Sequence, residues 1–456
     1  MTDNEAVPPP GCPAHGGRVP LHGPEFAANP QDYYEYMRQY GPTAPVELAP
    51  GVEATLVTDY TAALRLLQDP HSFRKDSRRW RDLNEGKVSP DSPVLPLLAY
   101  RPNCMFSDGA EHLRLRQAVT DTLAKINPRR LSDNTRKISD YLIAQFSARG
   151  SVDLMNDYAK QLPLFVFNDL FGCPAEIGDR VLFGITGIFD GVKAEQANQV
   201  LAEAVTELVA IKRRKPEEDV TSWLMQHPSQ LSDEEMAHQL VLLLGAGGEP
   251  ERNLIGNTLH LLFTDEHYAM NGLLDKAIED TLWEAPPMSN YAPHYAASDM
   301  EFAGQKVRAG DLMLVSFAAA NTSPALATAR QSSGDRSHLA WSAGPHACPS
   351  QEPARIIAHT AIENLLNRLP DIQLAVPEDS LTWRPGPFNR ALAALPARFT
   401  PIPTAPGPRP PMASVHPLPM PTPAPAPVAP TVSGDVAAPR PEQGGVWSSF
   451  LKWWRG

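Results

Sequence analysis

The segment His338-Leu339-Ala340-Trp341-Ser342-Ala343-Gly344-Pro345-His346-Ala347-Cys348-Pro349-Ser350 is the most informative part of the chain. It places one cysteine, Cys348, in a loop punctuated by glycine and proline, just before a helical pattern at about 353–368. Free backbone N–H groups and the positive end of the helix dipole lower the pKa of a thiol at a helix start. The loop therefore predicts a thiolate that acts as a nucleophile or a metal ligand, against the alternative of a buried structural cysteine.

The spacing in this loop resembles the haem-binding loop of the cytochrome P450 family, aromatic-Gly-x-Gly-x-His-x-Cys-x-Gly. The aromatic residue, the second glycine, the histidine and the cysteine are here Trp341, Gly344, His346 and Cys348. The resemblance implies haem b as the cofactor, with the Cys348 thiolate as axial iron ligand and the other three residues around the haem. Ser342 and Ser350 replace the remaining glycines, and we expect the loop to tolerate these changes.

The composition is that of a globular protein. Hydrophobic residues make up 42% of the 456-residue chain and charged residues 20%, and the net charge of −12 argues against nucleic acid as a partner. The four cysteines, Cys12, Cys104, Cys173 and Cys348, show no paired spacing, which indicates a reducing compartment. We find neither a signal-peptide pattern at the start nor a run of about twenty apolar residues. These features predict a cytoplasmic protein.

The chain divides into four parts by composition. We expect a flexible arm over 1–25, a haem-thiolate domain over 26–400, a proline-rich linker over 401–443 and an amphipathic aromatic segment over 444–456. Resemblance to the cytochrome P450 family extends over about 20–400 and implies that fold, mainly α with a minor β part. The patterns predict strands around 45–59 and 299–318, and helices at about 60–67, 111–148, 155–225, 232–263, 268–284 and 353–368.

The tail differs in character from the rest of the chain. Fifteen of the 48 prolines lie between Pro401 and Pro441, which predicts a disordered linker. Beyond it, Trp447, Phe450, Leu451 and Trp454 form one stripe of a helix. A helix this short is unstable alone in water, so it must fold against its own chain, a membrane surface or a partner protein. The long tether favours a membrane surface or a partner, which would make the protein peripherally membrane-associated.

Basic side chains are needed to neutralise the two propionates of a haem. His112 and Arg116 stand four residues apart on one face of a predicted helix, where both can converge on a carboxylate. A solvated charged face is the alternative. The resemblance favours propionate binding and adds His346 as a third contact. At His294 relatives usually carry arginine, so we expect a weaker contact there.

A second helical segment aligns with the family pattern Ala-Gly-x-(Glu/Asp)-Thr-Thr. In that pattern small residues let the helix pass close to the iron, the acid connects to solvent protons and the alcohol orients dioxygen. Ala246, Gly247 and Glu249 match it, but Pro250 replaces the alcohol. Proline leaves the carbonyl of Ala246 without its helical donor. We expect a water there, through which Glu249 relays protons, and a simple helix break is the alternative.

The helix at 277–287 departs further from the family pattern. Where relatives carry Glu-x-x-Arg, this chain has Asp280 and Trp283, and the loop that follows Asn321 is short, leaving Arg330 and Arg336 as its cations. Removing a whole buried ion network can be nearly neutral when packing replaces it. We therefore expect accommodation, and a minority of actinobacterial relatives resemble this chain in lacking the pair.

Together these features predict a haem-thiolate monooxygenase, an oxidoreductase that inserts one oxygen atom of O₂ into a small organic substrate. The resemblance implies ferredoxin and ferredoxin reductase as electron donors, and Arg114, Arg129 and Arg130 would favour such an acidic protein. The alternative is a haem-binding regulatory or scaffold protein of the same fold with low turnover. Pro250, the altered 277–287 helix and the tail favour that alternative.

Overall fold

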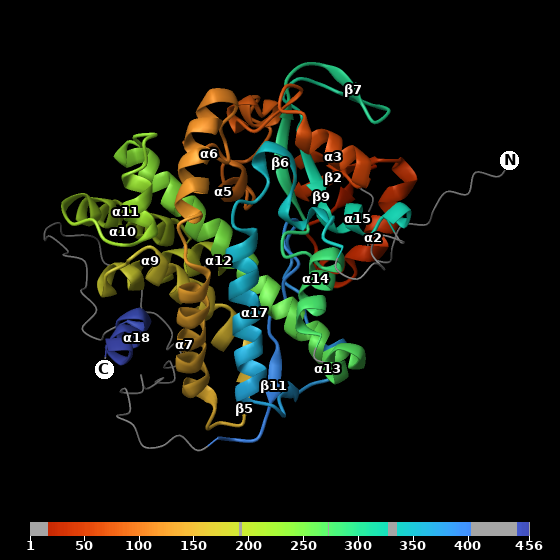
Figure 1. Cartoon of the computed structure of the whole chain (residues 1–456). Coiled ribbons are helices and arrows are strands. Elements are labelled where there is room, and N and C mark those ends of the chain that lie inside the picture. The colour runs from red at the N-terminus through yellow and green to blue at the C-terminus, as the bar shows by residue number, and fades with distance from the viewer. Residues whose placement is uncertain (1–16, 191–193, 272, 327–334, 403–444, 456) are drawn as a thin grey trace, which may run out of the picture.

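The computed structural model describes residues 17–190, 194–271, 273–326, 335–402 and 445–455. Most of this chain is helical, and the strands form one six-stranded sheet and two small ones. In Figure 1 the long helix α12 (Asp233–Thr264) runs through the middle of the molecule, and the large sheet lies on the right-hand side. The fold class predicted from the sequence, mainly α with a minor β part, is confirmed.

Helix α12 is the central support of the fold. Ser232 caps its first turn and Glu235 completes a capping box. It packs against α8, α10, α14 and α17. The helices are α1 (Pro24–Ala28), α2 (Pro30–Met37), α3 (Tyr60–Gln68), α4 (Arg81–Asn84), α5 (Leu95–Leu98), α6 (Gly109–Leu123), α7 (Pro128–Phe146), α8 (Gln161–Leu170), α9 (Ala175–Asp190), α10 (Ala194–Arg214), α11 (Val220–Met225), α12, α13 (Glu266–Asn271), α14 (Leu274–Glu284), α15 (Phe317–Asn321), α17 (Gln351–Arg368) and α18 (Val446–Arg455).

The large sheet joins segments that lie far apart in the sequence, in the order β1-β2-β3-β9-β6-β4. Strand β4 pairs antiparallel with β6, with Arg74 opposite Tyr295, so the residues after β4 lie beside those around position 294. The smaller sheets are β10-β11-β5 and β7-β8. The strands are β1 (Val19–Pro20), β2 (Thr43–Ala49), β3 (Val52–Val57), β4 (Phe73–Arg74), β5 (Ser151–Asp153), β6 (Asn290–Ala296), β7 (Met300–Phe302), β8 (Gln305–Val307), β9 (Leu312–Ser316), β10 (Gln373–Leu374) and β11 (Pro396–Arg398).

Several boundaries differ from the prediction. The helical stretch at 111–148 is two helices, because Pro128 occupies the first position of α7 and Asn127 caps it. Strand β6 was missed, since a proline at 293 weakens a strand pattern. The arm is shorter than 1–25: β1 pairs with β2, and Val19 and Leu21 are fully buried. Residues 1–16 of the predicted arm and 403–443 of the predicted linker lie outside the described residues.

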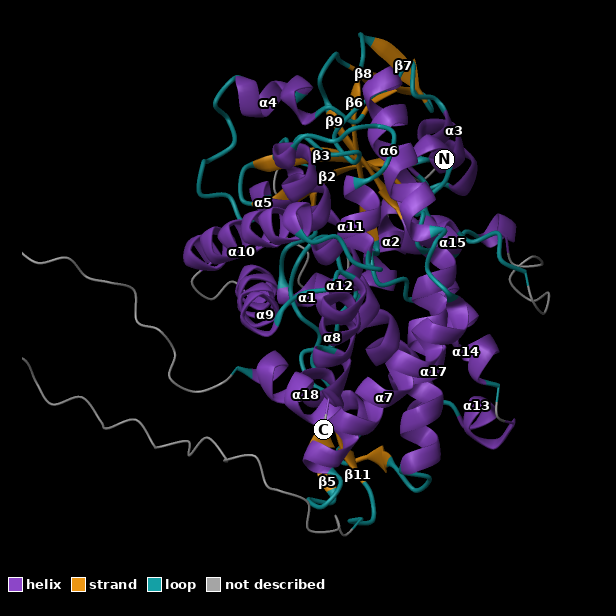
Figure 2. Cartoon of the chain, turned by 60° about the vertical axis from the view of Figure 1, so that its left-hand side comes forward, coloured by secondary structure: helices purple, strands orange, loops and turns teal. Residues whose placement is uncertain are grey.

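The C-terminal helix α18 packs on the body of its own chain, beside α7 and α9 (Figures 1 and 2). Trp447 and Phe450 are each 1% exposed. The Phe450 ring lies 5.1 Å from those of Tyr141 and Phe165, and Asp179 accepts a hydrogen bond from the Trp447 N–H at 2.7 Å. The prediction that this stripe docks on a membrane or a partner is therefore wrong, because the chain's own aromatic residues cover it.

Within the described ranges, no helix is both long enough and apolar enough to cross a membrane.

Candidate functional site

Cys348 lies in a tight loop between two short helical turns and α17. Its backbone N–H donates to the carbonyl of Trp341 at 2.8 Å, which closes the loop on itself. The N–H of Ser350 donates to the Cys348 sulfur at 3.4 Å, within the usual range for sulfur. The loop thus presents the sulfur at the start of α17, as the sequence predicts.

The thiol of Cys348 does not have the lowered pKa that its place before a helix suggests. Burial raises the pKa above the ordinary value, and the hydrogen bond from Ser350 and the charge of Arg116 oppose this only in part. Glu251 on α12 raises the pKa further. A metal cation bound at the sulfur would oppose this shift and favour the thiolate.

Two residues hold the loop in shape by their backbone conformation. Gly344 has φ of 69°, and a Cβ there would lie 2.1 Å from the carbonyl oxygen of Leu67, so no other residue fits without a shift. Ser342 has φ of 60° and ψ of −169°, a region that is almost exclusive to glycine. The loop forms with serine at this position, but the backbone of Ser342 is strained.

Helix α6 brings two predicted residues to this loop. The ring of His112 lies 3.9 Å from the ring of His346, and Arg116 donates to the carbonyl of Ala347. Arg114 points elsewhere: it pairs with Glu235 at the start of α12. The i, i+4 face of His112 and Arg116 is confirmed, because both contact the Cys348 loop and Arg114 does not.

Strands β4 and β6 add two further basic groups beside this pair. His294 on β6 is buried, and its Nδ1 lies 2.7 Å from the carbonyl of Ala292. Lys75, just beyond β4, is 4% exposed, and its Nζ donates to the carbonyl of Pro293 at 2.7 Å. No local sequence pattern predicts a role for Lys75, because the residue that it contacts lies 218 positions away.

These basic groups repel one another. Burial lowers the pKa of His112 to about 4 and that of Lys75 to about 7. The pKa of His346 is lowered by burial and then by Lys75, His112, His294 and Arg116 together. Asp108 is the acid that opposes the shifts of Lys75 and His112. A buried group of cations and imidazoles with so little counter-charge is suited to binding a dianion.

The site also holds buried polar atoms that lack partners in the described chain. These include Nε2 of His112 and Nε1 of Trp341, whose ring packs 5.5 Å from the guanidinium of Arg355. A thiolate ligand, unsatisfied donors and a basic cluster together fit a haem, whose iron binds sulfur and whose propionates accept hydrogen bonds.

Helix α12 leaves an open face in its middle. Ala246 is exposed although Leu244 and Gly248 beside it are buried, and a Cβ on Gly245 would meet no atom within 4 Å. Gly247, predicted to face the haem, instead faces α8: a Cβ there would lie 2.7 Å from the ring of Phe167. The open face is thus formed by Gly245 and Ala246.

Glu249 and Pro250 lie one turn further along α12. The helix continues through Pro250 without interruption, so the alternative of a simple helix break is wrong. Glu249 is 4% exposed and pairs with Arg252, at 3.5 Å, and with Arg384. Its carboxylate is therefore held in place by two arginines. A small pocket of about 20 Å³ lies beside it, between α8, α9 and α12.

A partly buried charged network is present on α14, one position away from the predicted residues. Glu279 accepts from Arg355 at 2.8 and 3.1 Å, and from His338 at 3.3 Å. Arg336 lies 3.4 Å from the same carboxylate. Burial raises the pKa of Glu279, but the hydrogen bonds from His338 and Arg355 outweigh it and the pKa is lowered. The network ties α14 to α17.

The two residues of α14 that align with the Glu-x-x-Arg pattern, Asp280 and Trp283, form contacts outside this network. Asp280 pairs with Lys276 and Tyr268 on the outer side, and Trp283 donates from Nε1 to the carbonyl of Asp335 at 3.0 Å. The expected loss of the charged network is therefore wrong, because the neighbouring carboxylate, Glu279, forms one. Arg330 lies outside the described residues.

The other cysteines take no part in the site. Cys104 and Cys173 are buried, and burial raises their pKa to about 11 and about 12. Cys12 lies outside the described residues. In the described part of the chain no group of three histidine, cysteine or acidic side chains is arranged to hold a bare metal ion.

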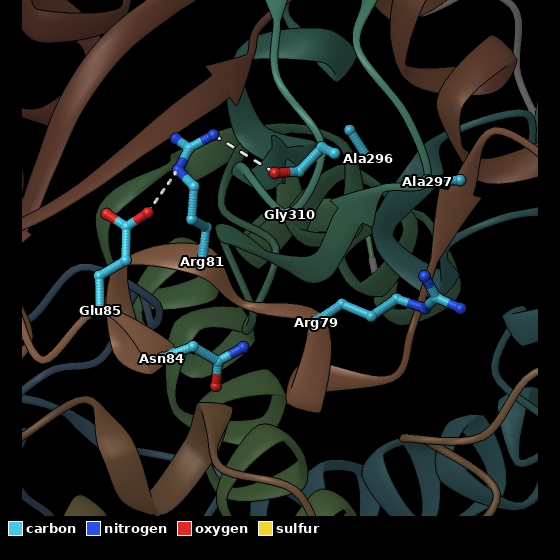
Figure 3. A pocket seen from close by; sticks show the side chains of 8 residues that line it. Arg79, Arg81, Asn84, Glu85, Ala296, Ala297 and Gly310 are labelled. Carbon is cyan, nitrogen blue, oxygen red and sulfur yellow. Dashed lines mark hydrogen bonds and ion pairs between the residues drawn. The ribbon is translucent and has the colours of Figure 1, made fainter.

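A surface pocket of about 330 Å³ lies at the end of β6, next to α4. As Figure 3 shows, Arg81 reaches toward Glu85. It also donates to the carbonyl of Ala309 at 3.3 Å. It also pairs with Asp311. Since the charge of Arg81 is already compensated and the Cys348 loop does not line this pocket, it is not part of the candidate site.

Comparison with known proteins supports the fit to a haem. Cytochrome P450 107B1 of Saccharopolyspora erythraea is 30% identical over 393 residues, 82% of this chain and 96% of that protein. Mycinamicin IV hydroxylase/epoxidase of Micromonospora griseorubida is 31% identical over 82% of this chain and 96% of its own length. The solved structure of CYP154C4 from Streptomyces sp. W2061 superposes with a TM-score of 0.75 at 28% identity, covering 83% of this chain and 97% of that one. No family model matches the chain.

Proposed function

The chain belongs to the cytochrome P450 family and is a haem-thiolate monooxygenase, and from this premise we propose the roles of its own residues. Cys348 ligates the iron, and His112, Arg116, His294 and His346 surround the propionates. The haem supplies the chemistry that splits dioxygen, one atom going to the substrate and the other to water. The single observation that carries the assignment is the convergence of the basic cluster on the Cys348 loop.

The assignment is tested by the reduced, CO-bound spectrum of the purified protein. Thiolate ligation gives the long-wavelength band that names the family, and Cys348→Ala should abolish it. Cys173→Ala is the matched control, since that cysteine is buried in the core beside Lys212 and Asp219, where its carbonyl accepts from Trp447. Retention of the band in Cys348→Ala would contradict the assignment.

For proton supply we propose Glu249, acting through water. The pocket beside it, about 20 Å³, has room for one water molecule. Its ion pairs with Arg252 and Arg384 would hold the carboxylate in place while protons pass along the water. Pro250→Thr, which restores the alcohol of the family pattern, should raise the fraction of reductant that ends in product. A fall in that fraction would mean that the proline is itself required.

As electron donor we propose a ferredoxin served by a ferredoxin reductase. Arg129 and Arg130 are exposed at the start of α7, where they can attract an acidic protein. Arg114 is committed to Glu235 and does not contribute. Arg129→Glu with Arg130→Glu should slow reduction by a ferredoxin and weaken its salt dependence, whereas Arg114→Ala should leave both unchanged. The free cysteines of the described chain accord with a reducing, cytoplasmic setting.

A low-turnover regulatory or scaffold role is the second candidate, and the absent alcohol at Pro250 favours it. Oxygen consumption, measured with a surrogate reductase, distinguishes the monooxygenase from the low-turnover protein. Normal haem content with negligible consumption, coupled or uncoupled, would favour the second candidate.

A further inference from the structure

Lys75 is a buried cation with one acceptor. It follows β4, whose pairing with β6 sets it beside Pro293 and His294. The backbone N–H groups of Lys75 and Asp76 donate to the carboxylate of Asp108 at 3.0–3.2 Å, which anchors the turn to the start of α6. These hydrogen bonds hold the backbone of Lys75 in place.

The ammonium group itself is poorly satisfied. Of its three donors, one is used by the carbonyl of Pro293, and in the described chain no other acceptor lies within hydrogen-bond distance. Burial lowers its pKa to about 7, and Asp108 offsets this only in part. Lys75 also lowers the pKa of His112, His294 and His346, so its charge acts on all three imidazoles. An anion bound among these groups would stabilise the buried ammonium in its charged form.

We propose that Lys75 is a direct ligand of a haem propionate and supplies the positive charge that position 294 lacks. The proposal rests on haem being the cofactor. His294 is a buried imidazole whose Nδ1 is already occupied by a backbone carbonyl, and its pKa is lowered well below the ordinary value by burial and by Lys75. It is therefore neutral and cannot balance a carboxylate, whereas Lys75 at the neighbouring backbone position can.

The experiment measures how fast the purified holoprotein releases haem to excess apomyoglobin. A hydrogen bond between charged groups contributes about 1.5–3 kcal/mol, so Lys75→Met should release haem roughly ten- to a hundredfold faster than wild type. Lys87→Met is the matched control, because Lys87 is 55% exposed and pairs with Asp82 at the surface. It should leave the release rate unchanged.

A second measurement separates a propionate contact from a loss of packing. The wild type and Lys75→Met are compared again when loaded with haem dimethyl ester, which has no propionate charge. If Lys75 acts through the propionates, the two proteins release the ester at similar rates. Equal release of native haem, or the same rate difference with the ester, would overturn the proposal. Absence of a thiolate CO band in the wild type would instead refute the haem assignment itself.

Discussion

Replacing Trp447 by alanine should undock helix α18. The indole is 1% exposed, stacks on Phe450 with ring centroids 4.9 Å apart and donates to the carbonyl of Cys173 at 3.3 Å. It fills a slot left by Gly178 on α9, where a Cβ would lie 2.0 Å from the indole ring. Truncating a buried tryptophan to alanine costs about 3–5 kcal/mol.

This cost is large because the helix depends on its docking contacts for its stability. A ten-residue helix does not persist alone in water, so its amides are protected from exchange only while it is docked. A loss of about 3–5 kcal/mol shifts the docking equilibrium by roughly 10²–10³-fold or more. Hydrogen exchange followed by mass spectrometry should therefore show peptides from 446–455 losing nearly all protection in Trp447→Ala.

Two further variants make the assay specific. Gly178→Ala should reproduce the loss from the receptor side, because its Cβ would occupy the indole site. Lys452→Ala should keep full protection, because Lys452 is exposed. The ferrous–CO band should be unchanged in all three, since α18 contacts α7, α8 and α9 and not the Cys348 loop. Unaltered protection in Trp447→Ala, or binding of wild-type protein to anionic vesicles through this helix, would refute the reasoning.

The remaining predictions concern the site. Arg116→Ala should lower haem occupancy in purified protein more than Arg114→Ala, because only Arg116 contacts the Cys348 loop; equal losses would contradict the geometry. Ser342→Gly should raise the free energy of unfolding by about 1 kcal/mol in urea titrations by relieving its backbone strain, and no gain would mean that the strain is absent. Burial, with help from Arg116, lowers the pKa of His112 to about 4, so the unfolded chain takes up this proton before the folded chain does. The haem-free protein should therefore lose stability as the pH falls from about 6.5 to about 4, and His112→Asn should flatten that slope in unfolding titrations across this range.

Local patterns in the sequence were sufficient to predict much of the fold and the proposed iron ligand. The Cys348 loop depends on glycine, proline and histidine within thirteen residues, and the capping box before α12 depends on residues three apart. The shared face of His112 and Arg116 follows from helical periodicity. These features are set by bonds and dihedral angles along a short stretch of chain, so they can be read before the chain is folded.

The tertiary structure decided the partners that come from distant segments. Lys75 joins the basic cluster because β4 pairs with β6. Glu279, not Asp280, forms the charged network because α14 presents that face to Arg355 on α17. Helix α18 rests on its own chain, not on a membrane, because α9 offers a glycine slot for Trp447. Each outcome depends on which surfaces meet after burial of the apolar core, and this packing is collective, so it is not encoded in any one segment of the sequence.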